Sequence, residues 1–356
     1  MQIAIQPDQG AGESYSSKWT EILREKGIGI KSVDITKPDF LDQLKDCNGL
    51  MWRWLHTPKD KLIAKRILYL IEQYLNVPVY PDFKTCWHFD DKVAQHYLFA
   101  TLNIPTVDTW VFWNRKEAVQ WAETTSYPKI FKLSAGAGAS NVLKVNSKAE
   151  AMVLIDKMFI RGIFSMTMNE YGKKFVHRRR EKIRDLIERG KEAVRFVLKG
   201  EYPSLPSCWW QPEKEYAYFQ EFIAENSFDT RVTVIGNRAF AFRRFNREND
   251  FRASGSGNID WNQTQINKEC IKIAFETSKK LDVQSMAYDF LYKEGKPIII
   301  EMSYTYADWA IEKCPGHWDQ DFNWVSGQMW PQEAQVEDFI QYIKDNKQHE
   351  HSVSHS

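Results

Sequence analysis

The first 85 residues alternate short apolar runs with amphipathic helical patterns, and this alternation is the strongest constraint on the fold. Strands are expected at 2–5, 29–35, 49–54 and 77–80, with helices at 15–26 and 61–75. Strands that alternate with helices form parallel βαβ units. The sequence therefore predicts an α/β domain with a parallel sheet at the start of the chain.

The rest of the chain predicts an α+β arrangement with antiparallel strands. After a helix at 90–102, the strand 128–133 runs into the small-residue loop Ser134–Ser140 and returns at 142–145. Backbone N–H groups in such a loop can approach a phosphate closely, although many turns share this composition. From residue 216 strands dominate, and the last pair, 287–292 and 297–302, is joined by Glu294-Gly295-Lys296. A final helix is expected at 335–344.

Composition excludes several classes of protein. Of 356 residues, 43% are hydrophobic and 27% charged, which is typical of a globular chain, and the net charge of +1 gives no support to general polyanion binding. The five cysteines form no C-x-x-C pair, which fits a reducing compartment. The chain has neither a secretory n-region nor an apolar run of about 18 residues, so we expect a cytoplasmic protein without a transmembrane segment.

Residues 173–199 differ in character from the rest of the chain. Eleven Lys or Arg residues stand against four acids, and apolar residues recur at helical spacing. This pattern predicts a basic amphipathic helix. Its charged face is either solvated or a docking site for an anionic partner such as a phosphate, a lipid headgroup or RNA.

Two acidic residues interrupt apolar strands near the end of the chain. Asp289 lies in Tyr288-Asp289-Phe290-Leu291, and Glu301 follows the apolar run 298–300. Because a short glycine turn joins these strands into a hairpin, both carboxylates can converge. Converging carboxylates repel unless a cation or proton joins them, and hard oxygen ligands favour Mg²⁺. The alternative is two unrelated acids at a sheet edge.

Arginines cluster before this pair of acids. Arg243, Arg244, Arg247 and Arg252 precede the small-residue segment 253–257. Guanidinium groups suit bidentate capture of phosphate or carboxylate. The chain contains no G-x-x-x-x-G-K-[ST] loop, no kinase H-R-D with D-F-G, and no H-E-x-x-H motif. The combination therefore favours phosphoryl chemistry on some other scaffold.

Seven features occur in a fixed order along the chain. They are Lys92, Lys132 before the small-residue loop, Gln220-Glu221-Phe222-Ile223, Asp229-Thr230-Arg231, Asp250-Phe251-Arg252, Asp289 and Glu301. In this order they resemble the ATP-grasp fold, and most of all the glutathione-synthetase-like carboxylate–amine ligases that include the glutamate ligases of ribosomal protein tails. The resemblance covers roughly residues 85–310, and the βαβ run before it is similar to a Rossmann-like pre-ATP-grasp domain.

The resemblance implies a role for each matched position. The ATP-binding set would be Lys92 and Lys132 on the phosphates, Gly136, Gly138 and Ser140 in a lid loop, Gln220, Glu221, Phe222 and Ile223 beside adenine, and Asp229 on the ribose. Arg252, with Arg244 and Lys132, would stabilise the transferring phosphate. Asp289, Glu301 and Ser303 would hold Mg²⁺. A second magnesium ion depends on Ser303, which stands where the family usually has Asn.

The matched regions also imply a division into domains. The pre-ATP-grasp domain would occupy residues 1–88, the central ATP-grasp subdomain 89–218 and the C-terminal subdomain 219–346, with a polar tail at 347–356. The central subdomain would carry the basic stretch as an insert at about 170–205.

The function implied by the resemblance is an ATP- and Mg²⁺-dependent ligase. It would join a carboxylate to an amine through an acyl phosphate and release ADP and phosphate. We expect a small-molecule or glycan substrate, because the segment Cys314–Trp318 suits a sugar, and we expect a homo-oligomer. Two alternatives stay open: a catalytically weak ATP-binding module, and an ATP-grasp kinase that phosphorylates without ligation.

Overall fold

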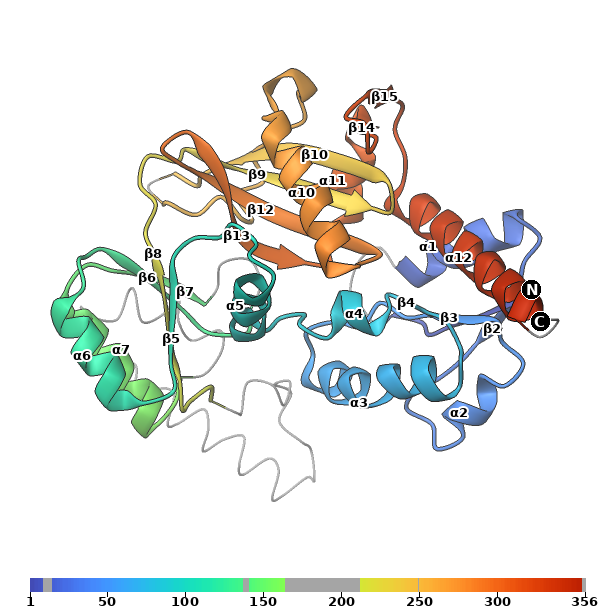
Figure 1. The fold of residues 1–356 in the computed structure, drawn as a ribbon, viewed down its shortest axis with the longest axis horizontal. Coiled ribbons are helices and arrows are strands. Elements are labelled where there is room, and N and C mark those ends of the chain that lie inside the picture. The colour runs from blue at the N-terminus through green and yellow to red at the C-terminus, as the bar shows by residue number, and fades with distance from the viewer. Residues whose placement is uncertain (9–14, 137–140, 164–211, 249, 354–356) are drawn as a thin grey trace, which may run out of the picture.

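The computed structural model describes residues 1–8, 15–136, 141–163, 212–248 and 250–353 of the chain (Figure 1). Gly138, Ser140 and the predicted basic insert at about 170–205 lie outside these residues. The helices are α1 (Tyr15–Glu25), α2 (Phe40–Gln43), α3 (Pro58–Tyr74), α4 (Phe83–Cys86), α5 (Lys92–Thr101), α6 (Arg115–Thr124), α7 (Lys148–Ile160), η2 (Gln263–Gln265, a 3-10 turn), α10 (Lys268–Leu281), α11 (Asp308–Glu312) and α12 (Pro331–Val353). In this part of the chain, no helix combines the length and the apolar character needed to cross a bilayer.

The N-terminal sheet is parallel throughout, as the alternating pattern predicts. Its order is β2 (Gly29–Ser32), β1 (Gln2–Ile5), β3 (Gly49–Met51) and β4 (Val79–Tyr80). Successive side chains of a strand point to opposite faces. Ile3 and Ile5 therefore pack in one core cluster with α1 and α12, whereas Ala4 packs in another with α3.

The last helix, α12, covers the N-terminal sheet although it comes from the other end of the chain. Val336, Phe339, Ile340 and Ile343 recur at helical spacing, and all four are buried against β1 and α1. The helix begins before the predicted residue 335 and continues to Val353. The stretch predicted as a polar tail is therefore largely helical.

The central sheet is antiparallel, with α6 and α7 packed on it. Its order is β5 (Thr109–Phe112), β8 (Ala217–Glu221), β6 (Lys129–Lys132) and β7 (Val142–Val145). The predicted hairpin of β6 and β7 forms as expected. Beside this sheet, Ile163 and Glu213 form an isolated antiparallel bridge in which each backbone N–H donates to the other carbonyl at 2.9 Å.

The C-terminal sheet carries the predicted acidic hairpin. Its order is β13 (Lys296–Ser303), β12 (Ser285–Lys293), β9 (Phe228–Ile235), β10 (Arg238–Phe245), β14 (Gly316–Trp318) and β15 (Trp324–Ser326), and β11 (Ile259–Asp260) also pairs with β10. Glu294 and Gly295 both have positive φ values in the turn, which allows the tight connection of β12 to β13. The antiparallel register places Asp289 opposite Glu301.

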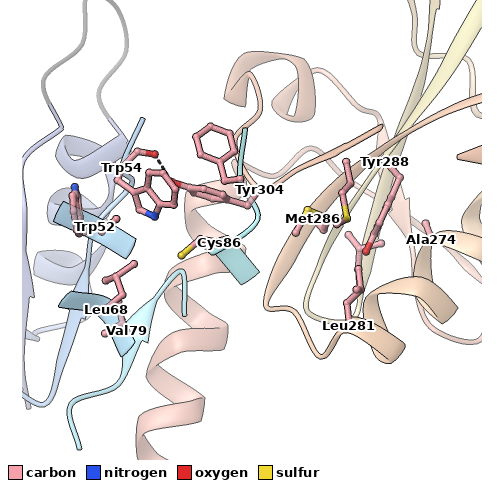
Figure 2. Close-up of a cluster of buried hydrophobic side chains, with 14 of the residues drawn as sticks. Trp52, Trp54, Leu68, Val79, Cys86, Ala274, Leu281, Met286, Tyr288 and Tyr304 are labelled. Carbon is pink, nitrogen blue, oxygen red and sulfur yellow. Dashed lines mark hydrogen bonds between the residues drawn. The ribbon is translucent and has the colours of Figure 1, made fainter. Parts of the chain in front are cut away.

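An aromatic contact joins the N-terminal part of the chain to this hairpin (Figure 2). Tyr304 directly follows β13, and its hydroxyl donates to the backbone oxygen of Trp54. The rings of Trp54 and Phe89 lie with centroids 5.0 Å apart, and those of Phe89 and Tyr304 4.7 Å apart. Edge-to-face packing of this kind fixes where β13 ends relative to the loop before α5.

We expect Phe339→Ala to destabilise the protein by about 3–5 kcal/mol, because the ring is 1% exposed and its removal leaves a cavity between α12 and the N-terminal sheet. Tyr342→Ala on the same helix is the matched control, since that ring is 49% exposed and its loss should cost much less. Urea unfolding followed by far-ultraviolet circular dichroism measures both. Equal losses for the two variants would contradict the packing of α12.

Candidate functional site

A cavity of about 570 Å³ lies between the central sheet, the C-terminal sheet and the loop before α5. This volume suits a small-molecule ligand. The sequence-predicted site residues that line it are Lys92, Lys132, Gly136, Gln220, Glu221, Phe222, Ile223, Asp229, Arg252, Asp289, Glu301 and Ser303. Arg244 is not one of the lining residues. Residues far apart in the sequence thus meet in one cavity, although this placement by itself tests none of their roles.

One end of the cavity is apolar and is bordered by β8. Ile130, Val142 and Leu291 contribute aliphatic lining. The Gln220 amide donates to Thr109 Oγ1 at 3.0 Å and to the Tyr218 hydroxyl at 2.8 Å. These bonds hold the end of β8 in place beside a surface that suits a flat, weakly polar ring.

Two side chains that follow β8 and β10 approach each other across this end of the cavity. Phe222 follows β8, and its ring centroid lies 5.7 Å from that of Phe251 in an edge-to-face arrangement. Lys144 of β7 lies over the Phe222 ring at 3.9 Å. Glu221 is paired with Lys293 at 2.7 Å. The charged and aromatic contacts together link the central sheet to the C-terminal sheet.

Two buried lysines form the basic part of the cavity. Burial lowers the pKa of Lys132 to about 8, and the positive charge of Lys92 adds to this effect while Glu301 opposes it. Its ammonium group has no hydrogen-bond or ion-pair partner among the described residues. Burial alone would lower the pKa of Lys92 as well, but Glu301 and Asp90 outweigh it, so that pKa is raised. Lys132 is therefore the lysine that gains most from an anionic ligand.

Asp289 is held by two arginines from neighbouring strands. Arg231 Nε and Nη2 donate to its two carboxylate oxygens at 2.7 and 2.8 Å, and Arg244 Nη2 reaches it at 2.8 Å. Arg244 also binds Asp229 with bonds of 2.7 and 2.6 Å. Burial would raise the pKa of Asp289, but Arg231 and Arg244 hold it well below its usual range. The two aspartates and the two arginines thus compensate each other's charges inside the sheet.

The ion pairs between these two aspartates and two arginines affect the roles expected from the sequence for Asp229, on the ribose, and for Arg244, on the transferring phosphate. Both oxygens of Asp229 already accept bonds from Arg244, so a ribose would compete with a guanidinium for them. Glu225 lines the same cavity, is exposed, and has no ion-pair partner in the described part of the chain. Arg244 itself is 6% exposed and is placed to hold acids in the sheet.

Arg252 lines the cavity from the loop that follows β10. Its Nε donates to Asp250 Oδ1 and Oδ2, each at 2.9 Å, and its Nη2 donates to Oδ2 at 2.6 Å. Asp250 therefore orients the guanidinium within the loop. The side chain of Arg252 remains partly exposed and lines the cavity.

The acidic hairpin presents two carboxylates to the cavity, and of these, in the described part of the chain, Asp289 is bonded by arginines whereas Glu301 is not. Asp289 and Glu301 are cross-strand neighbours and both line the cavity. Glu301 is about one-third exposed, and its ion-pair partner is Lys92 at 3.3 Å. Among the described residues, no group of three or more His, Cys, Asp or Glu side chains could hold a metal alone. This fits Mg²⁺, which is typically held by one or two carboxylates together with substrate phosphates.

Ser303, the remaining predicted metal ligand, is engaged in a local turn. Its hydroxyl donates to the Thr305 carbonyl oxygen at 2.9 Å and accepts from the Thr305 N–H at 3.2 Å. The Thr305 hydroxyl also lies 3.2 Å from the Ser303 hydroxyl oxygen, so it would compete with a metal ion for the remaining lone pair. Its part in a second magnesium site stays a prediction.

Some charged or titratable residues that line the cavity were assigned no role from the sequence. Arg231, Glu225 and His56 all lie there, the last from the loop before α3. Arg231 belongs to the Asp229-Thr230-Arg231 motif, and its positive charge two positions after Asp229 could have indicated that it pairs with an acid at the site. His56 and Glu225 stand in loops with no pattern around them, and only tertiary structure brings them to the cavity.

We expect Asp289→Asn to destabilise the fold by about 3–5 kcal/mol, because it removes the buried carboxylate that the buried Arg244 and the partly exposed Arg231 share. Glu301→Gln should cost less than about 1 kcal/mol, because Glu301 is far more exposed. Chemical unfolding of the two variants measures the difference. A small loss for Asp289→Asn would contradict the structural role of this carboxylate.

We expect Lys132 to react with acetic anhydride at a rate that is half-maximal near pH 8, because the neutral amine is the reactive form and the pKa is about 8. Mass spectrometry of peptides follows the labelling, with the exposed Lys280 as the reference site. Labelling of Lys132 that rises only above pH 10 would contradict the unpaired, buried ammonium group.

Comparison with known proteins identifies the scaffold. Residues 187–314 match the RimK-like ATP-grasp domain. The comparison with curated proteins found no match. The fold is shared with the RimK domain protein ATP-grasp from Sphaerobacter thermophilus (10% identity, 96% of this chain and 100% of that one, TM-score 0.54). It is also shared with D-alanine–D-alanine ligase from Bacillus anthracis (12% identity, 99% of this chain and 99% of that one, TM-score 0.56). A further example is the macrocyclase MdnC from Microcystis aeruginosa, bound with precursor peptide MdnA (12% identity, 96% of this chain and 100% of that one, TM-score 0.55). The predicted fold class is thereby confirmed: the chain has the fold of these ATP-grasp proteins, and residues 187–314 match the RimK-like ATP-grasp domain.

Proposed function

We propose that this protein uses ATP to activate a carboxylate as an acyl phosphate and then joins it to an amine, releasing ADP and phosphate. The observation that carries the proposal is the cavity itself, in which an apolar end, two buried lysines, Arg252 and a pair of carboxylates on one hairpin lie together. Each part matches one part of a nucleotide and its transferring phosphate.

We assign each cavity-lining residue a role according to its surroundings. The apolar end by β8 would take the base, and Lys92 and Lys132 would bind the phosphates. Arg252 would stabilise the group in transfer. Glu301 and Asp289, assisted by Ser303, would hold Mg²⁺, which when bound neutralises phosphate charge. Such catalysis rests on positioning and charge neutralisation.

The proposed reaction has two steps. A carboxylate oxygen attacks the γ-phosphorus, the bond to the β-phosphate oxygen breaks, and ADP leaves. The amine then attacks the acyl carbon, phosphate leaves with the carbon–oxygen bond pair, and the amine proton passes to solvent. Arg252 faces the increased charge in both steps.

The substrates are best sought among small carboxylates and amines. The segment Cys314–Trp318, expected to suit a sugar, offers little surface: Cys314 and Trp318 are buried, and Trp318 packs on Trp324 with centroids 4.6 Å apart. The glycan expectation therefore loses its sequence-based support. The anionic partner of the basic stretch and the homo-oligomer stay predictions.

A direct test is ADP release in a screen of carboxylate and amine pairs, repeated with hydroxylamine in place of the amine. Hydroxylamine converts an acyl phosphate into a hydroxamate. A ligase needs the carboxylate for ADP release and yields a hydroxamate, whereas a kinase acting on a hydroxyl yields none. Slow ADP release that no carboxylate accelerates would favour the weak ATP-binding module instead.

We expect Arg252→Ala to lower kcat about 10²–10³-fold while changing the KM for ATP far less, because the charge that Arg252 faces develops mainly in the transition state. Arg243→Ala is the matched control: Arg243 is paired with Asp260 and does not line the cavity. Steady-state kinetics measures both variants. Intact kcat with weak ATP binding in Arg252→Ala would place this arginine at another part of the nucleotide.

A further inference from the structure

The first backbone N–H groups of the small-residue loop are already bonded to carboxylates. Ser134 N–H donates to Glu213 Oε2 at 2.8 Å, and Ala135 N–H donates to Glu213 Oε1 at 3.2 Å. Gly136 N–H donates to Asp90 Oδ1 at 2.6 Å. The sequence suggested that N–H groups of this loop approach a phosphate, but at these three positions they hold the protein together instead.

Glu213 is held in position for this contact through both its backbone and its side chain. The residue is fixed on its backbone by the bridge to Ile163. The Tyr216 hydroxyl donates to its carboxylate and also accepts the Ser134 N–H at 2.7 Å. Burial raises the pKa of Glu213, while the bonds from Tyr216, Ala135 and Ser134 favour the charged form. A partly buried carboxylate with this many donors is a specific structural anchor.

The loop that Glu213 anchors also contacts Lys92. The Lys92 N–H donates to the Ser134 carbonyl oxygen at 3.0 Å, and its Nζ donates to the Gly136 carbonyl oxygen at 2.9 Å. The same Nζ lies 3.3 Å from Glu301. One ammonium group therefore joins the base of the loop to the acidic hairpin on the opposite side of the cavity.

We propose that Glu213 is a positioning residue for ATP: its carboxylate fixes Ser134 and Ala135, and through them it sets where Lys92 stands in the cavity. This inference rests on the proposed function, since it assigns the anchored lysine to ATP phosphates. Glu213 does not line the cavity and acts through residues that do.

The test is the variant Glu213→Gln, in which an amide NH₂ replaces one of the two acceptors. The dissociation constant of a non-hydrolysable ATP analogue, measured by calorimetry, should rise about 10-fold, because one loop N–H loses its acceptor and the loop shifts. The KM for ATP should rise equally, with kcat at saturating ATP within about 2-fold. Glu215→Gln is the matched control: this neighbouring acid is exposed and contacts no part of the loop in the described structure.

Amide hydrogen exchange gives a second measurement that needs neither ATP nor turnover. Exchange at residues 134 and 135 should be slow in the unmodified protein and at least 10-fold faster in Glu213→Gln, with Glu215→Gln unchanged. If Glu213→Gln does not fold, Tyr216→Phe tests the same anchor, and its ATP affinity should fall about 3-fold. An anchor variant with unchanged ATP affinity and unchanged exchange overturns the inference. Absence of ATP binding by the unmodified protein would instead remove the proposed function.

Discussion

The arrangement of Asp229, Arg244, Asp289 and Arg231 is the interaction on which the C-terminal sheet depends. These residues lie on β9, β10 and β12, three adjacent strands. Buried charges are tolerated only when they are paired, and a one-residue slip of a strand would turn its charge to the opposite face. The network therefore favours one register among β9, β10 and β12. The short turn at Glu294 and Gly295 then sets Asp289 of β12 against Glu301 of β13. Three of the four charged side chains, Asp229, Arg231 and Asp289, line the cavity.

The cavity also depends on contacts between parts of the chain that are distant in sequence. Tyr304, at the end of the acidic hairpin, packs against Trp54 and Phe89 (Figure 2). Helix α12, from the C-terminal end of the chain, packs against β1 (Figure 1). The N-terminal sheet is thereby fixed against the C-terminal sheet on two sides. Such packing allows a loop from the N-terminal part, which carries His56, to reach the cavity.

Local patterns explain why much of this fold could be predicted from the sequence. The parallel sheet follows from alternating strands and helices, and the acidic hairpin follows from two apolar runs around Glu294-Gly295. The ion pairs could not be predicted in this way. Asp289 and Arg231 are 58 positions apart, and their contact requires that β12 pairs with β9, which no local pattern specifies.

The remaining differences have similar physical origins. Glu213 meets the loop at 134–135 across nearly 80 positions, so its anchoring role is invisible in a stretch of polar sequence. The length of α12 was underestimated because its last turns lack an apolar face, although helical hydrogen bonding continues there. Backbone propensity thus extends an element beyond the part that packing requires.

The bridge between Ile163 and Glu213 has a consequence for how this protein can vary. Because the two backbones bond directly to each other, Ile163 and Glu213 are held side by side next to the central sheet although 50 positions separate them in the sequence. The cost of closing a loop grows only slowly with its length, so the bridge itself sets little limit on how many residues lie between its two ends.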